Sequence, residues 1–136
     1  MDIQELNWPG IFCSAFMAVV FLQSGLDKVF NFKQELGWIQ QKFVRSPLYG
    51  YVKTLLVLLT AMECLSGVLS AVGVLQLLTS GEVVVAWNGM LLSAATLLAL
   101  IFGQRVSKDY SGAATLVPYF IVSILGLYAL TAAIQL

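Results

Sequence analysis

The sequence predicts an all-α fold, a four-helix transmembrane bundle, and three observations support it. The chain of 136 residues is 60% hydrophobic and only 10% charged, whereas a soluble domain carries roughly 25% charged residues. Four apolar runs match the length of about 20 residues that a spanning helix needs. The runs lack the alternation of membrane β-barrel strands, and helices satisfy their own backbone hydrogen bonds in lipid. We therefore expect one transmembrane domain over residues 1–136.

The first predicted span covers residues 9–30. Pro9 suits the first turn of a helix, where a backbone N–H is not needed for an intrahelical bond. The residues before it contain no Lys or Arg, so they lack the positively charged start of a secretory signal. We expect this first apolar run to be kept as a membrane helix.

An amphipathic helix is predicted over residues 32–46, between the first and second spans. Its apolar residues recur at spacings of four, three and four, which places them on one face: Phe32, Leu36, Ile39 and Phe43. Lys and Gln residues lie mostly off that face. We expect this helix to lie in the membrane interface, with its Lys side chains toward anionic headgroups. A linker packed against the bundle is a second interpretation, and the two are compatible.

The second and third spans are predicted over residues 52–78 and 83–103. The turn "TSGE" between them is short, so these helices are expected to be antiparallel neighbours. The fourth span is predicted over residues 113–136 and contains Pro118, which either starts the helix or kinks it. We expect the helix to begin close to Pro118, because the 19 residues from there reach about 28 Å.

All seven basic residues fall on one side of the predicted bundle. They lie in or beside the first and third connections: Lys28, Lys33, Lys42, Arg45, Lys53, Arg105 and Lys108. Because basic connections stay in the cytoplasm, we expect both termini on the non-cytoplasmic side. The net charge is zero, so we expect a lipid bilayer as partner and no nucleic acid.

The composition excludes several kinds of catalytic site. The chain contains no His, which removes the commonest general base and metal ligand, and we expect no metal. Cys13 and Cys64 lie in different predicted helices without a CxxC motif, so we interpret them as small buried hydrophobic residues. Phosphate-binding and dinucleotide-binding motifs are also missing from the sequence. We identify no catalytic residues, and whether the chain takes part in catalysis is left open.

Glu63 is the sharpest polar feature, because it lies in the middle of an apolar span. A charged residue at a helix centre costs about 2.5 to 3.5 kcal/mol on insertion scales, so Glu63 must be neutral or find partners. Gly67 and Ser70 follow on the same face, and small residues allow close helix packing. We expect Glu63 to face protein, at the depth of Gln23 and Ser24. It is either neutral and hydrogen-bonded to them, or the centre of a ligand or proton site.

A second polar group is predicted at the cytoplasmic end of the bundle. Asp27 and Lys28 end the first span after Gly25, which narrows the helix, and Arg105 and Asp109 lie in the third connection. One interpretation is structural: Lys28 extends to the interface, and Asp109 or a neighbouring Ser caps the fourth helix. The functional interpretation is the mouth of a pocket lined by Lys28, Arg105 and Asp109.

The chain resembles the DoxX family of small four-span bacterial membrane proteins. The resemblance rests on three segments: "FLQSGLDKVFNF" at 21–32, "MECLSGVLSAVG" at 62–73 and "GQRVSKDYSGAATLVPYF" at 103–120. Its recurring polar positions are similar to Gly25, Lys28, Glu63, Gly67 and Asp109 here. The resemblance implies the bacterial cytoplasmic membrane. It also implies a link to membrane oxidoreductases such as thiosulfate:quinone oxidoreductase, with redox subunits as partners and a quinone as the implied cofactor.

Three functional hypotheses follow. The first is an accessory subunit of a membrane redox assembly that binds a quinone or another apolar ligand between its helices. The second is a membrane scaffold without ligand or activity, in which the polar residues fix helix packing. The third is a small transporter or proton path, which is disfavoured because relay groups and internal repeats are missing from the sequence. A homo-oligomer is compatible with each of these.

Overall fold

The computed structural model describes residues 3–135, and within this range the regular structure is helical, without strands. Five α-helices follow one another: α1 (Trp8–Phe30), α2 (Phe32–Lys42), α3 (Val52–Thr79), α4 (Val84–Val106) and α5 (Tyr110–Gln135). Two short 3₁₀ helices, η1 (Ile3–Glu5) and η2 (Tyr49–Tyr51), precede α1 and α3. The predicted all-α fold is confirmed.

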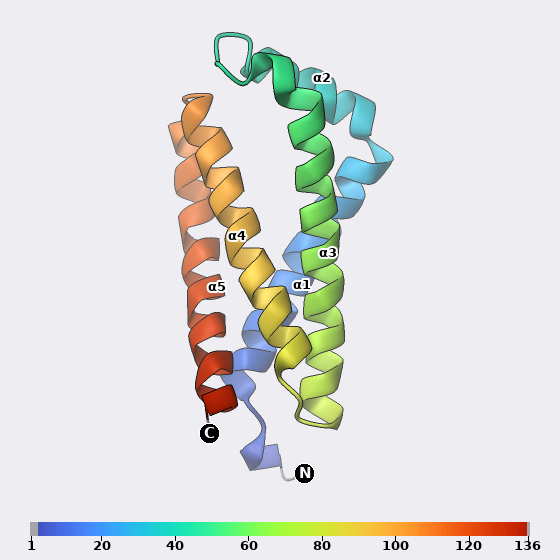
Figure 1. Cartoon of the computed structure of the whole chain (residues 1–136), viewed down its shortest axis with the longest axis vertical. Helices are drawn as coiled ribbons and strands as arrows, with labels where there is room; N and C mark the ends of the chain where they lie inside the picture. The colour runs from blue at the N-terminus through green and yellow to red at the C-terminus, as the bar shows by residue number, and fades with distance from the viewer. Residues whose placement is uncertain (1–2, 136) are drawn as a thin grey trace.

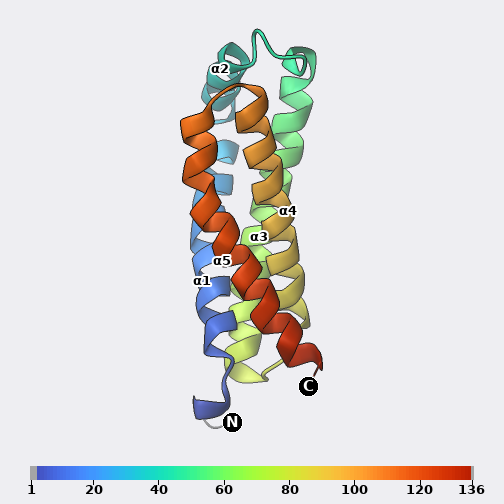
Figure 2. The same ribbon diagram turned by 90° about the vertical axis from the view of Figure 1, so that its left-hand side faces the viewer.

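Helices α1, α3, α4 and α5 form an upright bundle, and α2 lies across one of its ends (Figure 1). Each of these four helices is long and apolar enough to cross a membrane. Helix α3 packs between α1 and α4, while α5 packs against α4 and contacts α1. Both chain ends lie at the end of the bundle opposite α2, as two views of the ribbon show (Figures 1 and 2). The chain is therefore an integral membrane protein of four spans.

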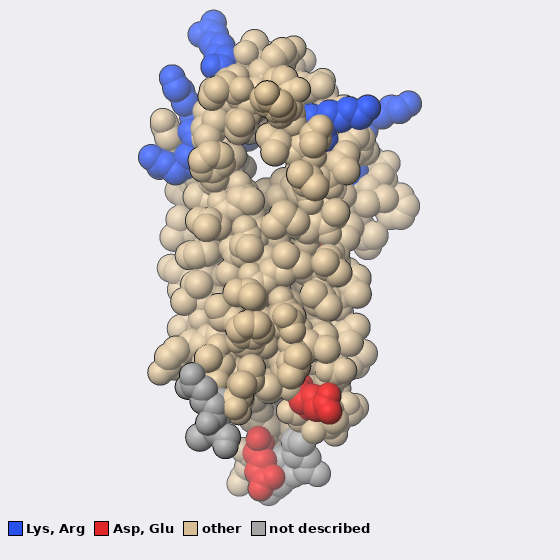
Figure 3. Space-filling model, in the orientation of Figure 1, with Lys and Arg blue, Asp and Glu red and all other residues tan. Residues whose placement is uncertain are grey.

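The lateral surface of the bundle is apolar. Large hydrophobic side chains are exposed along every long helix, among them Phe12, Val68, Leu98, Leu125 and Tyr128. The Lys and Arg side chains gather at the α2 end, and the acidic side chains visible on this face lie near the chain termini (Figure 3). Asp27, Glu35 and Asp109 lie at the α2 end. An apolar belt with its charges at the two ends suits a bilayer, whose hydrocarbon core is about 30 Å thick.

The ends of α1 and α2 follow from local chemistry. The Asn7 side chain accepts a hydrogen bond of 3.1 Å from the Gly10 N–H, which caps the start of α1. Helix α2 ends at Lys42, four residues before the predicted end at 46. Pro47 disfavours the helical conformation for the residue before it, and the chain from Phe43 onward forms turns instead.

The prediction that the last helix begins close to Pro118 is wrong. Helix α5 begins at Tyr110 and continues through Pro118. Asp109 caps this start, since its carboxylate accepts a hydrogen bond of 3.0 Å from the Gly112 N–H. Pro118 removes one backbone donor, and membrane helices tolerate this when local adjustments satisfy the freed carbonyl. An early cap therefore outweighs an internal proline here.

Small residues let the helices approach closely. A methyl group on Gly67 of α3 would lie 2.8 Å from the backbone nitrogen of Leu22 in α1. One on Gly25 of α1 would lie 2.8 Å from the Cys64 sulfur, and Ser70 is fully buried where α3 meets Gly89 of α4. These contacts bring the polar face of α3 into the centre of the bundle.

Candidate ligand-binding site

Glu63 is fully buried on the face of α3 that packs against α1. Its Oε2 atom accepts a hydrogen bond of 2.8 Å from the Ser24 hydroxyl. The Lys28 ammonium lies 3.1 Å from the same oxygen and donates to the Ser24 hydroxyl at 2.9 Å. Glu63 therefore faces protein, as expected, within a three-residue polar cluster that joins α1 to α3.

The partners of Glu63 differ in part from the prediction. Ser24 is a partner, but Gln23 is exposed on another side of α1, about 100° around the helix from its neighbour. Lys28, in place of Gln23, is the second partner of the Glu63 carboxylate. Side chains of a helix lean toward its N-terminus, and the N-terminal direction of α1 leads into the bundle from Lys28. The lysine side chain therefore extends inward to Glu63. Choosing partners by the depth of their Cα atoms along the helix does not predict this contact.

The cluster leaves two polar groups with unused bonding capacity. The Oε1 atom of Glu63 is buried and has no hydrogen-bond partner among the described residues. A lysine ammonium carries three N–H donors, and Ser24 and Glu63 occupy two of those on Lys28. The Lys28 side chain is 15% exposed, so its third donor is available to a group outside the cluster.

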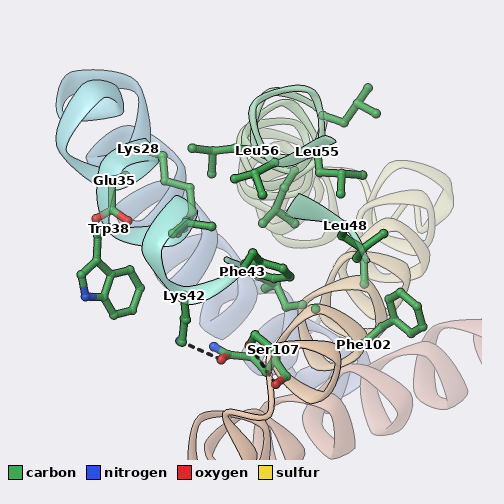
Figure 4. A pocket seen from close by; sticks show the side chains of 18 of the residues that line it. Lys28, Glu35, Trp38, Lys42, Phe43, Leu48, Leu55, Leu56, Phe102 and Ser107 are labelled. Carbon is green, nitrogen blue, oxygen red and sulfur yellow. Dashed lines mark hydrogen bonds between the residues drawn. The ribbon is translucent and has the colours of Figure 1, made fainter. Parts of the chain in front are cut away.

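Lys28 lines a cavity of about 420 Å³ between α2, α3 and α4 (Figure 4). Most of its lining is apolar and comes from the facing turns of these helices, for example Leu59 and Leu100. Five polar residues complete the lining: Lys28, Glu35, Lys42, Gln104 and Ser107. An apolar cavity of this size with a few polar groups is typical of a small-molecule site.

The cavity opens sideways onto the apolar belt. Leu55 and Leu58 of α3 and Phe102 of α4 line the cavity and are 40%, 56% and 61% exposed. The space-filling view shows an opening between the upper ends of α3 and α4 (Figure 3). The two helices that border this opening are both long and apolar enough to cross a membrane.

Helix α2 covers one end of the cavity, and Lys42 joins it to the end of α4 and the start of α5. The Lys42 ammonium donates to the Gln104 side chain at 3.0 Å, forms an ion pair with Asp109, and lies 4.5 Å from the centre of the Trp38 ring. The hydrogen bond from Lys42 lowers the pKa of Asp109, and the Gly112 N–H adds to this. Sequence reasoning assigned Lys42 to headgroups and missed this role, although Trp38 four residues earlier shares its helix face.

The structure separates the other predicted site residues. Arg105 is exposed and its guanidinium lies 4.9 Å from the centre of the Tyr110 ring. Asp27 is exposed beside a polar hollow formed with the start of α2. Of the predicted pocket mouth, Lys28 thus lines the cavity, Asp109 reaches its edge through Lys42, and Arg105 points elsewhere.

The cysteines and the acidic residues do not form a metal or disulfide centre in the part of the chain described. Cys13 and Cys64 are free thiols that pack against Gly126 of α5 and Gly25 of α1, respectively. Residues 3–135 contain no group of three or more metal-ligating side chains.

Comparison with protein-family models, curated proteins and solved structures finds no match to this chain. The resemblance to the DoxX family therefore stays a prediction from the sequence segments that carry it.

Proposed function

We propose that this protein is a DoxX-like accessory subunit of a bacterial membrane redox assembly, and that it binds a quinone or another apolar ligand between its helices. The observation that supports this most is the cavity between α2, α3 and α4, which opens sideways toward lipid and ends at Lys28. The polar cluster of Ser24, Lys28 and Glu63 forms the inner end of this site.

The residues of the cavity suit a quinone. Its apolar walls accommodate a ring and tail, and the Lys28 and Gln104 side chains offer donors for carbonyl oxygens. A quinone would supply the electron-accepting chemistry of the assembly. Lys28 would hold the head group, and Glu63 would hold Lys28 in place while the apolar walls exclude water.

We further propose that the α2 end faces the cytoplasm, with both termini on the opposite side of the cytoplasmic membrane. The basic side chains that gather at this end support this orientation (Figure 3), because the positive-inside rule keeps such segments in the cytoplasm. In the same orientation α2 would lie in the interface, where the exposed Lys33 could contact anionic headgroups.

Gentle solubilisation from native membranes, followed by mass spectrometry of co-purifying proteins and lipids, tests the proposal. We expect a quinone or another apolar molecule together with a redox subunit, and a lower activity of that assembly in Glu63→Gln. Purified protein without either component, and an unchanged assembly activity in Glu63→Gln, would contradict the proposal. The scaffold hypothesis, in which the polar cluster only fixes α1 on α3, would then be favoured.

A further inference from the structure

We propose that the cavity selects uncharged amphiphiles whose head group accepts hydrogen bonds, and that Glu63 sets this selectivity by neutralising Lys28. The inference rests on the proposed function, because it concerns the ligand of the same cavity. It adds a chemical class of head group and names a positioning residue that acts through Lys28.

Hydrogen-bond donors line the cavity at two places, one on Lys28 and one on Gln104. Lys28 has one N–H left after its contacts with Ser24 and Glu63. The Gln104 carbonyl oxygen accepts from Lys42, which leaves the amide NH₂ of Gln104 as a donor. A head group with carbonyl or ester oxygens provides the acceptors that these donors require.

Charge pairing makes the cavity a poor site for an anion. Both ammonium groups on the wall already have a carboxylate partner, since Lys28 pairs with Glu63 and Lys42 pairs with Asp109. Glu35 adds a further carboxylate to the lining. An anionic head group would therefore find no uncompensated cation, and it would face like charges in surroundings of low dielectric constant.

The same geometry predicts how removing the negative charge of Glu63 changes the selectivity. Glu63→Gln keeps an oxygen that accepts from Ser24 and Lys28, so the side-chain positions are retained while the negative charge is lost. Lys28 then presents an unpaired positive charge to the cavity. The selectivity should shift from the uncharged toward the anionic amphiphile.

Two probes of equal chain length separate these cases: cis-parinaric acid and its methyl ester, which differ in head-group charge. Trp8 and Trp87 lie at the far end of the bundle, so replacing both by Phe leaves Trp38, which lines the cavity, as the only tryptophan. Energy transfer from Trp38 to either probe then reports binding. The protein is placed in phosphatidylcholine nanodiscs at about pH 9, because the bilayer raises the pKa of a fatty acid above that of a carboxyl group in water.

We expect the ester to bind more than roughly tenfold tighter than the acid, because like-charge contacts are strongly unfavourable. Glu63→Gln should reduce or reverse this ratio, whereas Glu82→Gln in the exposed turn between α3 and α4 should preserve it. Equal binding of the two probes, or a ratio unaffected by Glu63→Gln, would overturn this inference alone. Binding of neither probe would overturn the inference and the proposed function together.

Discussion

At the scale of single residues, Lys28 shows what the sequence could predict and what it could not. The apolar surroundings of Glu63 were sufficient to predict a buried carboxylate that faces protein. Its ion-pair partner was not predictable from depth alone, because the partner depends on the direction in which a long side chain leaves its helix. A carboxylate buried in a membrane protein needs a polar partner, and the direction of the side chains on α1 determines that this partner is Lys28.

The first prediction concerns Glu63. Glu63→Leu removes both contacts of the carboxylate and leaves Lys28 without its counter-charge, so we expect a loss of about 1 to 3 kcal/mol in the free energy of unfolding. Glu63→Gln also removes the counter-charge but keeps an oxygen that accepts from Ser24 and Lys28, so its melting temperature should lie between those of Glu63→Leu and the wild type. Thermal melting in detergent measures both. Equal melting temperatures for Glu63→Leu and the wild type would contradict a packing role for the cluster.

A second prediction concerns Gly67, where α1 and α3 meet. An added methyl group would lie 2.8 Å from the Leu22 backbone nitrogen, and a backbone atom cannot move aside as a flexible side chain can. We expect Gly67→Ala to destabilise the protein by about 1 to 3 kcal/mol, although Ala is the better helix former.

Gly37→Ala is the matched control for this substitution. Gly37 lies on α2 with open space around it, so only the helix propensity changes and stability should stay equal or rise. Thermal melting of the two variants side by side gives the comparison. A Gly67→Ala protein that melts as high as Gly37→Ala would contradict the close contact of α1 and α3.

At the scale of elements, the existence of the four spans was predictable and several helix ends were not. A run of about 20 apolar residues in lipid has few alternatives to a helix. The ends depend on single hydrogen bonds, such as the cap that Asp109 forms at the start of α5. The cavity was not predictable, because it requires the amphipathic segment after α1 to fold back over α3 and α4.

The third prediction concerns the tie between α2 and the α4–α5 connection. Asn caps helices as well as Asp does, so Asp109→Asn should keep the start of α5 and lose only the ion pair with Lys42. We expect the backbone amides of α2 to exchange with deuterium about twofold to fivefold faster, because an exposed ion pair contributes only a small stabilising free energy. Unchanged exchange in α2 would show that other contacts hold this helix.

The same ion pair predicts a dependence on pH. Contact with Lys42 lowers the pKa of Asp109 below its usual value of 3.8, so the folded state binds this proton less readily than the unfolded state. The stabilising contribution is present above that usual value and is lost as the pH falls through the lowered pKa. The protection factors of the α2 amides, which correct for the pH dependence of intrinsic exchange, should therefore fall only in acid below pH 3.8, and Asp109→Asn should abolish this fall.

At the scale of the whole molecule, the distribution of charge determines the expected topology. The basic residues lie at the α2 end and both chain ends lie at the other (Figures 1 and 3). We expect tags on the N-terminus and the C-terminus to be equally accessible from the periplasm in intact cells. Tags accessible on opposite faces of the membrane would contradict an even number of spans.

The central claim is that the cavity beneath α2 holds an amphiphile taken up from the membrane. Native mass spectrometry tests it most directly when the wild type is compared with Gly103→Leu and Gly37→Leu. Gly103 lines the cavity, and a Cβ atom there would meet only Phe43 at 3.8 Å, so a leucine is expected to occupy part of the cavity, whereas Gly37 lies in open space outside it. We predict a bound apolar molecule on the wild type and Gly37→Leu that is lost from Gly103→Leu. Equal adducts on all three proteins, or none on the wild type, would contradict the claim.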